Sequence, residues 1–127
     1  MNYSIDKQDR YAVFRLEENN LNSLIAPELK SKFVLLSTEE EISNLIFDLS
    51  DVEFVDSSGL SAILTANRLW KRLGSFVITG IEHPSVKKLM EISRLDSVLT
   101  IIPTVSESID FIFMDQIEKE LNDEDGE

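Results

Sequence analysis

Hydrophobic residues recur along this chain at two spacings, one typical of buried strands and the other typical of helices. An apolar run within residues 42–49 indicates a central strand buried on both faces, as in a parallel or mixed sheet. Shorter strands are predicted over residues 2–7, 11–16, 75–79 and 98–102. Because strands and helices alternate after residue 25, the pattern predicts an α/β domain with crossover connections.

Between these strands the apolar residues follow the helical spacing of three or four positions. Helices are predicted over residues 25–37, 57–73 and about 84–93. Gly74 is well placed to end the second helix, and Trp70 near its end is expected to pack rather than to bind a partner. Thr104 and Glu107 have the spacing of a capping box, so a last helix should begin there.

The apolar residues of the last helix do not all share one face. Its main apolar face is predicted to contain Val105, Ile109, Ile112, Phe113, Ile117 and Leu121. Phe111 and Met114 lie off this face, so either they form an exposed patch for self-association or the helix is buried broadly. Residues 122–127 are mostly acidic and are predicted to be a disordered tail after a single domain over residues 1–121.

Composition and charge narrow the classes of function. The chain has 127 residues, no cysteine and a formal net charge of −12, which disfavours thiolate chemistry, nucleic-acid binding and anionic membrane surfaces. It contains no apolar run long enough to span a bilayer and no visible signal peptide. We therefore expect a cytoplasmic protein, without membrane insertion, whose partners are proteins or small molecules.

Few residues offer catalytic or metal-binding chemistry. His83 is the only histidine and is expected to be a solvated loop residue. Four carboxylates within nine residues either bind a divalent cation or, as we prefer, form turns and cap one helix: Asp48, Asp51, Glu53 and Asp56. No glycine-rich phosphate loop is present, and no nucleophile, base and oxyanion donor can be named together. The sequence therefore predicts no enzyme activity, no metal site and no cofactor.

The most informative motif is Asp56-Ser57-Ser58-Gly59, at the start of the second predicted helix. Unpaired backbone N–H groups and the helix dipole favour negative charge there, so a phosphate would be tolerated by its own helix and would disturb a docked partner. Capping alone would explain one serine, because serine is a preferred N-cap residue. Two serines exceed that need, and Gly59 is expected to leave the approach to the helix end open.

In this register the chain resembles the STAS domains of bacterial anti-sigma-factor antagonists. Residues 48–60 resemble the family's signature, in which a central strand ends in a D-S-S-G turn before the second helix. Residues 25–29, 76–80 and 86–95 resemble the start of its first helix, its next strand and the stretch before its last strand. The resemblance implies a STAS fold with a mixed, mostly parallel sheet of four to five strands and about four helices.

The resemblance also implies a switch between partners. Family members bind an anti-sigma factor that is also a serine kinase, and this kinase phosphorylates the serine just before the glycine. That serine is Ser58 here, with Ser57 as the second candidate; the phosphorylated form lets go, and a phosphatase resets it. The expected partner-binding surface consists of Asn20, Asn22, Ser23, Asp56, Ser57, Ser58, Gly59, Ser61 and Ala62.

One departure and two alternatives stay open. Asn22 stands where the family has an acidic residue thought to help phosphorylation, and an amide keeps the shape of that side chain but loses its charge. The first alternative is a STAS accessory subunit of a transporter or other signalling complex, which needs no phosphorylation. The second is a small-molecule or nucleotide sensor with a cleft near Asp48, Asp56 and Ser58. The chain is expected to be a monomer or a weak dimer.

Overall fold

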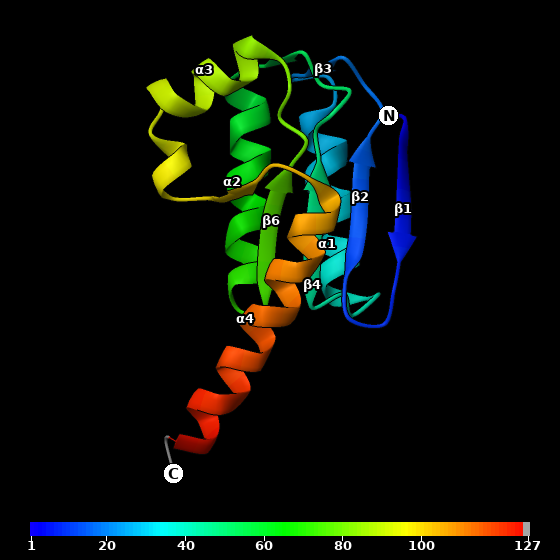
Figure 1. The fold of residues 1–127 in the computed structure, drawn as a ribbon. Coiled ribbons are helices and arrows are strands. Elements are labelled where there is room, and N and C mark those ends of the chain that lie inside the picture. Colours follow the sequence, from blue (N-terminus) through cyan, green and yellow to red (C-terminus); the bar gives the residue numbers. More distant parts are fainter. Residues whose placement is uncertain (126–127) are drawn as a thin grey trace.

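A five-stranded sheet forms the middle layer of the computed structural model, which describes residues 1–125 (Figure 1). Its strands lie in the order β1 (Tyr3–Lys7), β2 (Ala12–Leu16), β4 (Asn44–Asp48), β6 (Ser75–Thr79) and β7 (Thr100–Ile102). β1 pairs with β2 antiparallel, and the other neighbouring strands pair parallel. The predicted mixed, mostly parallel sheet is therefore confirmed.

Helices cover both faces of this sheet. Helices α1 (Ala26–Thr38) and α2 (Ser57–Lys71) pack on one face, and α4 (Val105–Asp125) packs on the other (Figure 1). Every residue of β4 and β6 is buried, because successive side chains of a strand point to opposite faces and both faces are covered. Leu45 and Phe47 thus join the core under α1 and α2, whereas Ile46 joins the smaller cluster under α4.

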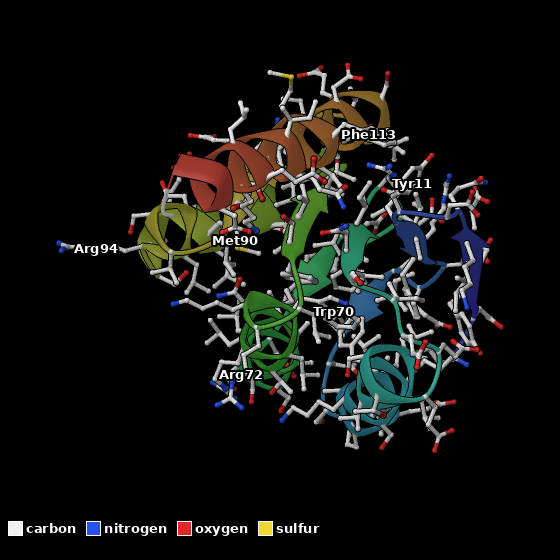
Figure 2. All side chains as sticks on the ribbon, turned by 90° about the horizontal axis from the view of Figure 1, so that it is seen from below. Tyr11, Trp70, Arg72, Met90, Arg94 and Phe113 are labelled. Atoms are coloured by element: carbon white, nitrogen blue, oxygen red, sulfur yellow. The ribbon has the colours of Figure 1, made fainter. Side chains whose placement is uncertain are left out.

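Aromatic side chains fill the larger core. Phe33 of α1 makes edge-on contacts with Phe47 at 5.2 Å and with Trp70 at 5.7 Å between ring centroids. Trp70 is completely buried between α2 and the sheet, and its Nε1 donates a hydrogen bond of 2.8 Å to the carbonyl oxygen of Ile42 (Figure 2). The prediction that Trp70 is a packing residue is confirmed.

Helix α4 begins as predicted but buries only the part of the predicted apolar face that includes Ile109 and Ile112. The backbone N–H of Glu107 donates to Thr104 Oγ1 at 3.1 Å, so Thr104 caps the helix as predicted, while the Glu107 carboxylate accepts from the Thr104 hydroxyl at 3.2 Å rather than from its backbone N–H. Phe111 is half-buried against the sheet, while residues expected on the buried face are exposed: Phe113, Ile117 and Leu121. The helix continues to Asp125, so residues 122–125 are helical where a disordered tail was predicted, and residues 126–127 lie outside the described residues.

Two short strands were not predicted. β3 (Asn20–Leu21) and β5 (Phe54–Val55) pair in parallel and form a separate small sheet beside the carboxyl ends of β2 and β4. The remaining elements, α3 (Pro84–Ile92) and a 3-10 helix (Leu95–Ser97), connect β6 to β7. The small sheet matters for function because it brings the loop before α1 next to the start of α2.

Candidate functional site

The start of α2 and the loop before α1 form one surface at the carboxyl edge of the main sheet. The backbone N–H of Asp56 donates to the carbonyl oxygen of Leu21 at 3.1 Å, and that of Glu53 donates to Asn19 at 2.8 Å. These bonds join the two chain segments, together with the β3–β5 pairing. The structure therefore brings together the two groups of residues that the sequence predicted to form a partner-binding surface.

Asp56 caps α2, and neither serine does. Its carboxylate accepts a hydrogen bond of 2.9 Å from the backbone N–H of Gly59. Ser57 is exposed and Ser58 is partly exposed, and within residues 1–125 neither hydroxyl makes a hydrogen bond. Capping therefore does not explain the two serines. Both hydroxyls lie at the N-terminus of α2 without a hydrogen bond to the described residues.

Gly59 has a different role from the predicted one. It is buried, and a Cβ atom there would overlap the carbonyl oxygen of Leu21 and lie 2.8 Å from side-chain atoms of Leu21 and Val55. The glycine thus allows α2 to pack closely against β3 and β5. It does not open an approach for a partner, so its place in the predicted partner-binding surface was wrong.

Ala62 was also wrongly placed on that surface. Its side chain is completely buried in the main core, because it lies on the same helix face as Ile63 and Ala66. Ser61 is exposed, and its Oγ accepts a hydrogen bond of 2.9 Å from Lys30 Nζ of α1. The predicted residues that reach solvent are Asn20, Asn22, Ser23, Asp56, Ser57, Ser58 and Ser61.

Two apolar side chains on this surface were missed. Leu24 is 87% exposed beside Ser23, and Phe54 of β5 is 55% exposed. Phe54 also contacts the ring of His83, with 5.6 Å between the centroids. The sequence contains no clear signal for the exposure of Leu24, because the apolar residues Ile25 and Ala26 follow it directly. We define the site surface as these two side chains together with the exposed predicted residues above.

Asn22 organises the entry into α1. Its Oδ1 accepts a hydrogen bond of 3.0 Å from the backbone N–H of Leu24, and its carbonyl oxygen accepts one of 2.8 Å from Ala26. A side-chain oxygen is all that this turn requires, and asparagine supplies it without a charge.

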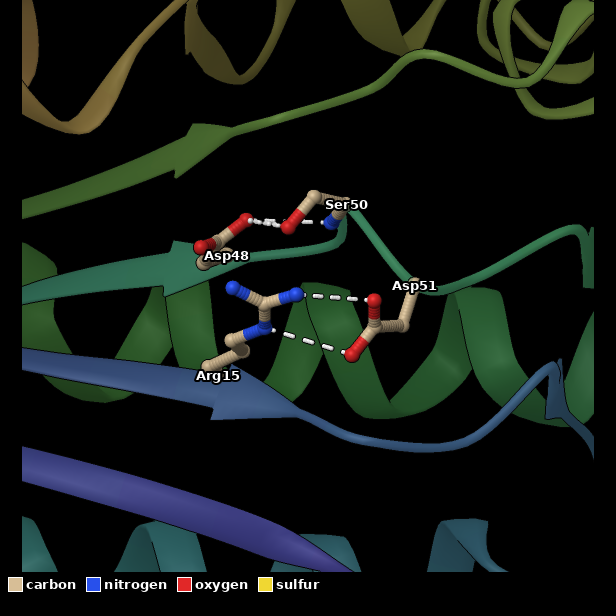
Figure 3. Close-up of polar contacts among 4 residues, drawn as sticks. All are labelled: Arg15, Asp48, Ser50 and Asp51. Atoms are coloured by element: carbon tan, nitrogen blue, oxygen red, sulfur yellow. Dashed lines mark hydrogen bonds and ion pairs between the residues drawn. The ribbon is translucent and has the colours of Figure 1, made fainter.

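Three of the four clustered carboxylates have separate partners, which supports the prediction that they form turns and a cap, and the fourth, Glu53, is exposed. Asp48 accepts hydrogen bonds from the backbone N–H and the Oγ of Ser50, at 3.0 and 2.8 Å (Figure 3). Asp51 pairs with Arg15, and Asp56 caps α2. Among the described residues no group of three His, Cys, Asp or Glu side chains is placed to hold a metal ion.

His83 is a helix cap rather than a solvated loop residue, which corrects the sequence prediction. Its side chain accepts a hydrogen bond of 3.3 Å from the backbone N–H of Ser85, and the ring is partly buried beside Phe54. Ser85 Oγ also donates to the carbonyl oxygen of Glu53. These contacts attach α3 to the edge of the site surface.

Arg15 holds the loop after β4 in place through Asp51. Its Nη2 and Nε donate to the two carboxylate oxygens at 2.8 and 3.2 Å (Figure 3). These hydrogen bonds, aided by the attraction between the charges, lower the pKa of Asp51. A lowered carboxyl pKa stabilises the fold above the unfolded-state value, and this contribution is lost as pH falls through the folded-state pKa.

We therefore expect the Arg15→Gln variant to raise the pKa of Asp51 towards its ordinary value. Carbon-detected NMR titration of the Asp51 carboxyl group measures this shift, with Arg94→Gln as a control because Arg94 is exposed elsewhere on the chain. An Asp51 titration curve that is identical in wild type and Arg15→Gln would contradict the ion pair.

The Gly59→Ala variant should be less stable than wild type by up to about 2 kcal/mol. Alanine has the higher helix propensity by about 1 kcal/mol, but the overlap with Leu21 and Val55 costs about 1–3 kcal/mol and reverses the sign. Urea unfolding followed by circular dichroism measures the change, with the exposed Ser61→Ala as control. A stabilised Gly59→Ala variant would show that α2 can move away from β3 and β5 at no cost.

Within the described residues no helix is both long enough and apolar enough to cross a membrane.

Comparison with known proteins identifies the fold and the family. The sequence model of the STAS domain matches residues 2–108, which is most of the chain. A putative anti-sigma factor antagonist from Thermotoga maritima has a similar structure, with a TM-score of 0.74 and 22% identity over 87% of this chain and 93% of that one.

Two further solved structures show how widely the fold is used. The Bacillus cell fate determinant SpoIIAA in its phosphorylated form matches with a TM-score of 0.66 and 19% identity, over 87% of this chain and 99% of that one. A sulfate transporter family protein from Wolinella succinogenes matches with a TM-score of 0.67 and 14% identity, over 84% and 88% of the two chains. The family model matches residues 2–108, more than half of this chain, and the chain therefore belongs to the STAS domain family.

Proposed function

We propose that this chain is an anti-sigma-factor antagonist that binds an anti-sigma factor of the serine kinase type through the site surface. Phosphorylation of Ser58 by that kinase releases the partner, and a phosphatase restores binding. The observation that carries the proposal is that Asp56 caps α2, which leaves two serine hydroxyls without a structural role at the start of that helix. The chain acts as a cytoplasmic binding protein and not as an enzyme.

The helix start suits a modification that must not unfold its own domain. A phosphate carries a charge of roughly −1.5 to −2, and the N-terminus of a helix favours negative charge. A partner seated on the same surface would have to desolvate that charge, which costs several kcal/mol unless a cation pairs with it. The phosphorylated SpoIIAA structure supports the proposal, because that protein has a similar fold.

The two exposed apolar side chains supply affinity for the unmodified state. A few side chains that a partner buries at the centre of an interface, ringed by contacts that exclude water, carry much of the binding energy. Phe54 belongs to β5, which pairs with β3, and Leu24 follows β3 by three residues, so both lie in the two segments that carry the hydroxyl and amide groups of the site surface. We expect the partner to cover both side chains.

The Leu24→Ala variant should bind the anti-sigma factor roughly tenfold more weakly, a loss of about 1–2 kcal/mol. Isothermal titration calorimetry with the purified kinase measures this, and Leu35→Ala is the matched control because Leu35 is 42% exposed on α1, outside the site surface. Equal losses in the two variants would mean that the partner does not use the site surface.

Phosphorylation itself is tested with the cognate kinase and ATP, followed by intact mass and peptide mapping. We expect one phosphate on Ser58, none in the Ser58→Ala variant, and continued modification of Ser57→Ala. Because Asn22 supplies no carboxylate, Asn22→Asp should be modified faster than wild type. A phosphate that maps only to Ser57, or no phosphate at all, would contradict the assignment to Ser58.

A transporter accessory subunit is the competing function, and the likeness to the Wolinella protein concerns the fold alone. Affinity capture from the source cell separates the two. Recovery of an ATPase-type kinase that binds a sigma factor supports the proposal, whereas recovery of a transporter component in its place would replace it.

A further inference from the structure

The outward side of α4 carries a continuous apolar stripe. It consists of Phe113, Met114, Ile117 and Leu121, which are 37%, 66%, 50% and 55% exposed. Ile117 follows Phe113 by four positions and Met114 by three, and Leu121 follows Ile117 by four, so the four residues share one broad face of the helix. They lie opposite the buried Ile112, and the helix that carries them extends past the amino ends of the parallel strands (Figure 1). We call these four residues the outer stripe.

Acidic side chains border the outer stripe. At 100° per residue, Asp110 lies in line with Ile117, while Glu118 and Glu120 flank the stripe on its two sides, and all three are exposed. Lys119 is the only basic residue of α4, and it points the other way. Its Nζ lies 3.0 Å from Asp115 and 3.5 Å from the carbonyl oxygen of Gly74.

One end of the stripe is fixed by the turn between β1 and β2. Phe113 meets the ring of Tyr11 edge-on with 6.2 Å between centroids, and the Arg10 guanidinium lies 6.0 Å from the Phe113 ring (Figure 2). The other three side chains have no such neighbour among the aromatic contacts of the described residues. The open part of the stripe thus runs from Met114 to Leu121, about 10–12 Å along the helix axis.

We propose that the outer stripe binds a cationic amphipathic helix of a partner protein. Such a helix would lay its apolar face on Met114, Ile117 and Leu121 and place lysine or arginine beside the flanking glutamates. Opposite charges in these flanking positions select the partner in paired helices. The charge pattern therefore defines the occupant: apolar along the middle and basic on both sides.

A second copy of this chain fits poorly. Two outer stripes facing each other would place Glu118 and Glu120 of both copies side by side, and like charges there disfavour pairing. An anionic membrane is repelled by the same carboxylates.

The outer stripe and the site surface lie at opposite ends of the molecule. The site surface follows the carboxyl ends of the parallel strands, and the last turns of α4 extend beyond their amino ends (Figure 1). Both surfaces can therefore be occupied together, and the docking proposal does not depend on the proposed function.

Binding of designed peptides to the full chain tests the proposal. The probe is a fluorescently labelled 18-residue helix of leucine and lysine with leucine at positions i, i+3, i+4 and i+7, measured by anisotropy in about 0.15 M salt. We expect the Met114→Gln/Ile117→Gln/Leu121→Gln variant to bind it at least tenfold more weakly than wild type. The Glu118→Gln/Glu120→Gln variant should bind several-fold more weakly and with a smaller dependence on salt.

Controls separate this contact from general attraction between charges. Val34→Gln/Leu35→Gln on α1 should bind like wild type, since these exposed apolar residues lie elsewhere. A peptide of the same composition with its leucines scrambled around the helix should bind as weakly as the triple-glutamine variant does. Circular dichroism confirms that each variant keeps its fold.

Three results would overturn the proposal. The first is binding of the scrambled peptide as tight as that of the original, and the second is equally tight binding of a peptide in which glutamate replaces every lysine. The third is unchanged binding by the triple-glutamine variant. A fourth result would replace the proposed occupant. If wild type sediments as a dimer and the triple-glutamine variant sediments as a monomer, the outer stripe binds a second copy of the chain.

Discussion

Replacing Ser58 with aspartate is expected to weaken binding of the anti-sigma factor by roughly 30- to 150-fold, or about 2–3 kcal/mol. Ser58→Ala should bind like wild type, because it adds neither charge nor bulk for the partner to accommodate. Titration calorimetry with the purified kinase, without ATP, measures both affinities. The expected loss arises at the interface, since Ser58 is partly exposed and makes no hydrogen bond within residues 1–125 that aspartate would break.

The matched control for this prediction is Ser106→Asp. Ser106 is the exposed second residue of α4, as Ser58 is the second residue of α2, so both substitutions add one carboxylate to the first turn of a helix. Only the Ser58 substitution should change binding, and neither should lower the melting temperature appreciably. If Ser58→Asp and Ser58→Ala bound the kinase equally well, the proposed release mechanism would fail.

The largest loss of stability is expected for Trp70→Ala, about 3–5 kcal/mol. Trp70 is completely buried, stacks on Phe76 at 6.1 Å and contacts Phe33 edge-on. Alanine would leave a large cavity there and would also leave the carbonyl oxygen of Ile42 without its donor.

Urea unfolding followed by far-ultraviolet circular dichroism measures this loss, since Trp70 is the only tryptophan and its fluorescence disappears with the mutation. Ile92→Ala is the control, because Ile92 is 69% exposed and its truncation should change stability by about 0.5 kcal/mol or less. A loss below about 1 kcal/mol for Trp70→Ala would mean that the core closes around the missing ring.

The longer helices and strands could be predicted because their hydrophobic periodicity repeats over enough residues to be recognised. β4, β6 and the first two helices lie within a few residues of the predicted ranges. β3 and β5 were not predicted, because a two-residue strand is too short to show a hydrophobic period and forms only by pairing with another strand. The position of the site surface depends on that pairing, so its two halves were predicted but the contact that joins them was not.

Errors at the site came from tertiary contacts and from one overlooked pattern. The role of Gly59 depends on Leu21 and Val55 approaching α2 from two other segments, which local sequence does not encode. The burial of Ala62 could have been predicted from the sequence, because Ala62 precedes Ala66 by four positions and lies on the same core-facing side of α2. For α4, the prediction assumed that the largest apolar face must be buried, and its last turns have no sheet to cover.

The bond from the Asp56 backbone to Leu21, the Asp56 cap and the close fit of Gly59 make the start of α2 a rigid block. A phosphate added to that block is not expected to change the backbone conformation around it. The phosphorylated and unphosphorylated forms would then have the same backbone structure, and they would differ for a partner only in surface charge and in the volume of the phosphate. Reversal needs only removal of the group, with no structural relaxation to wait for, so the speed of resetting would depend on the phosphatase.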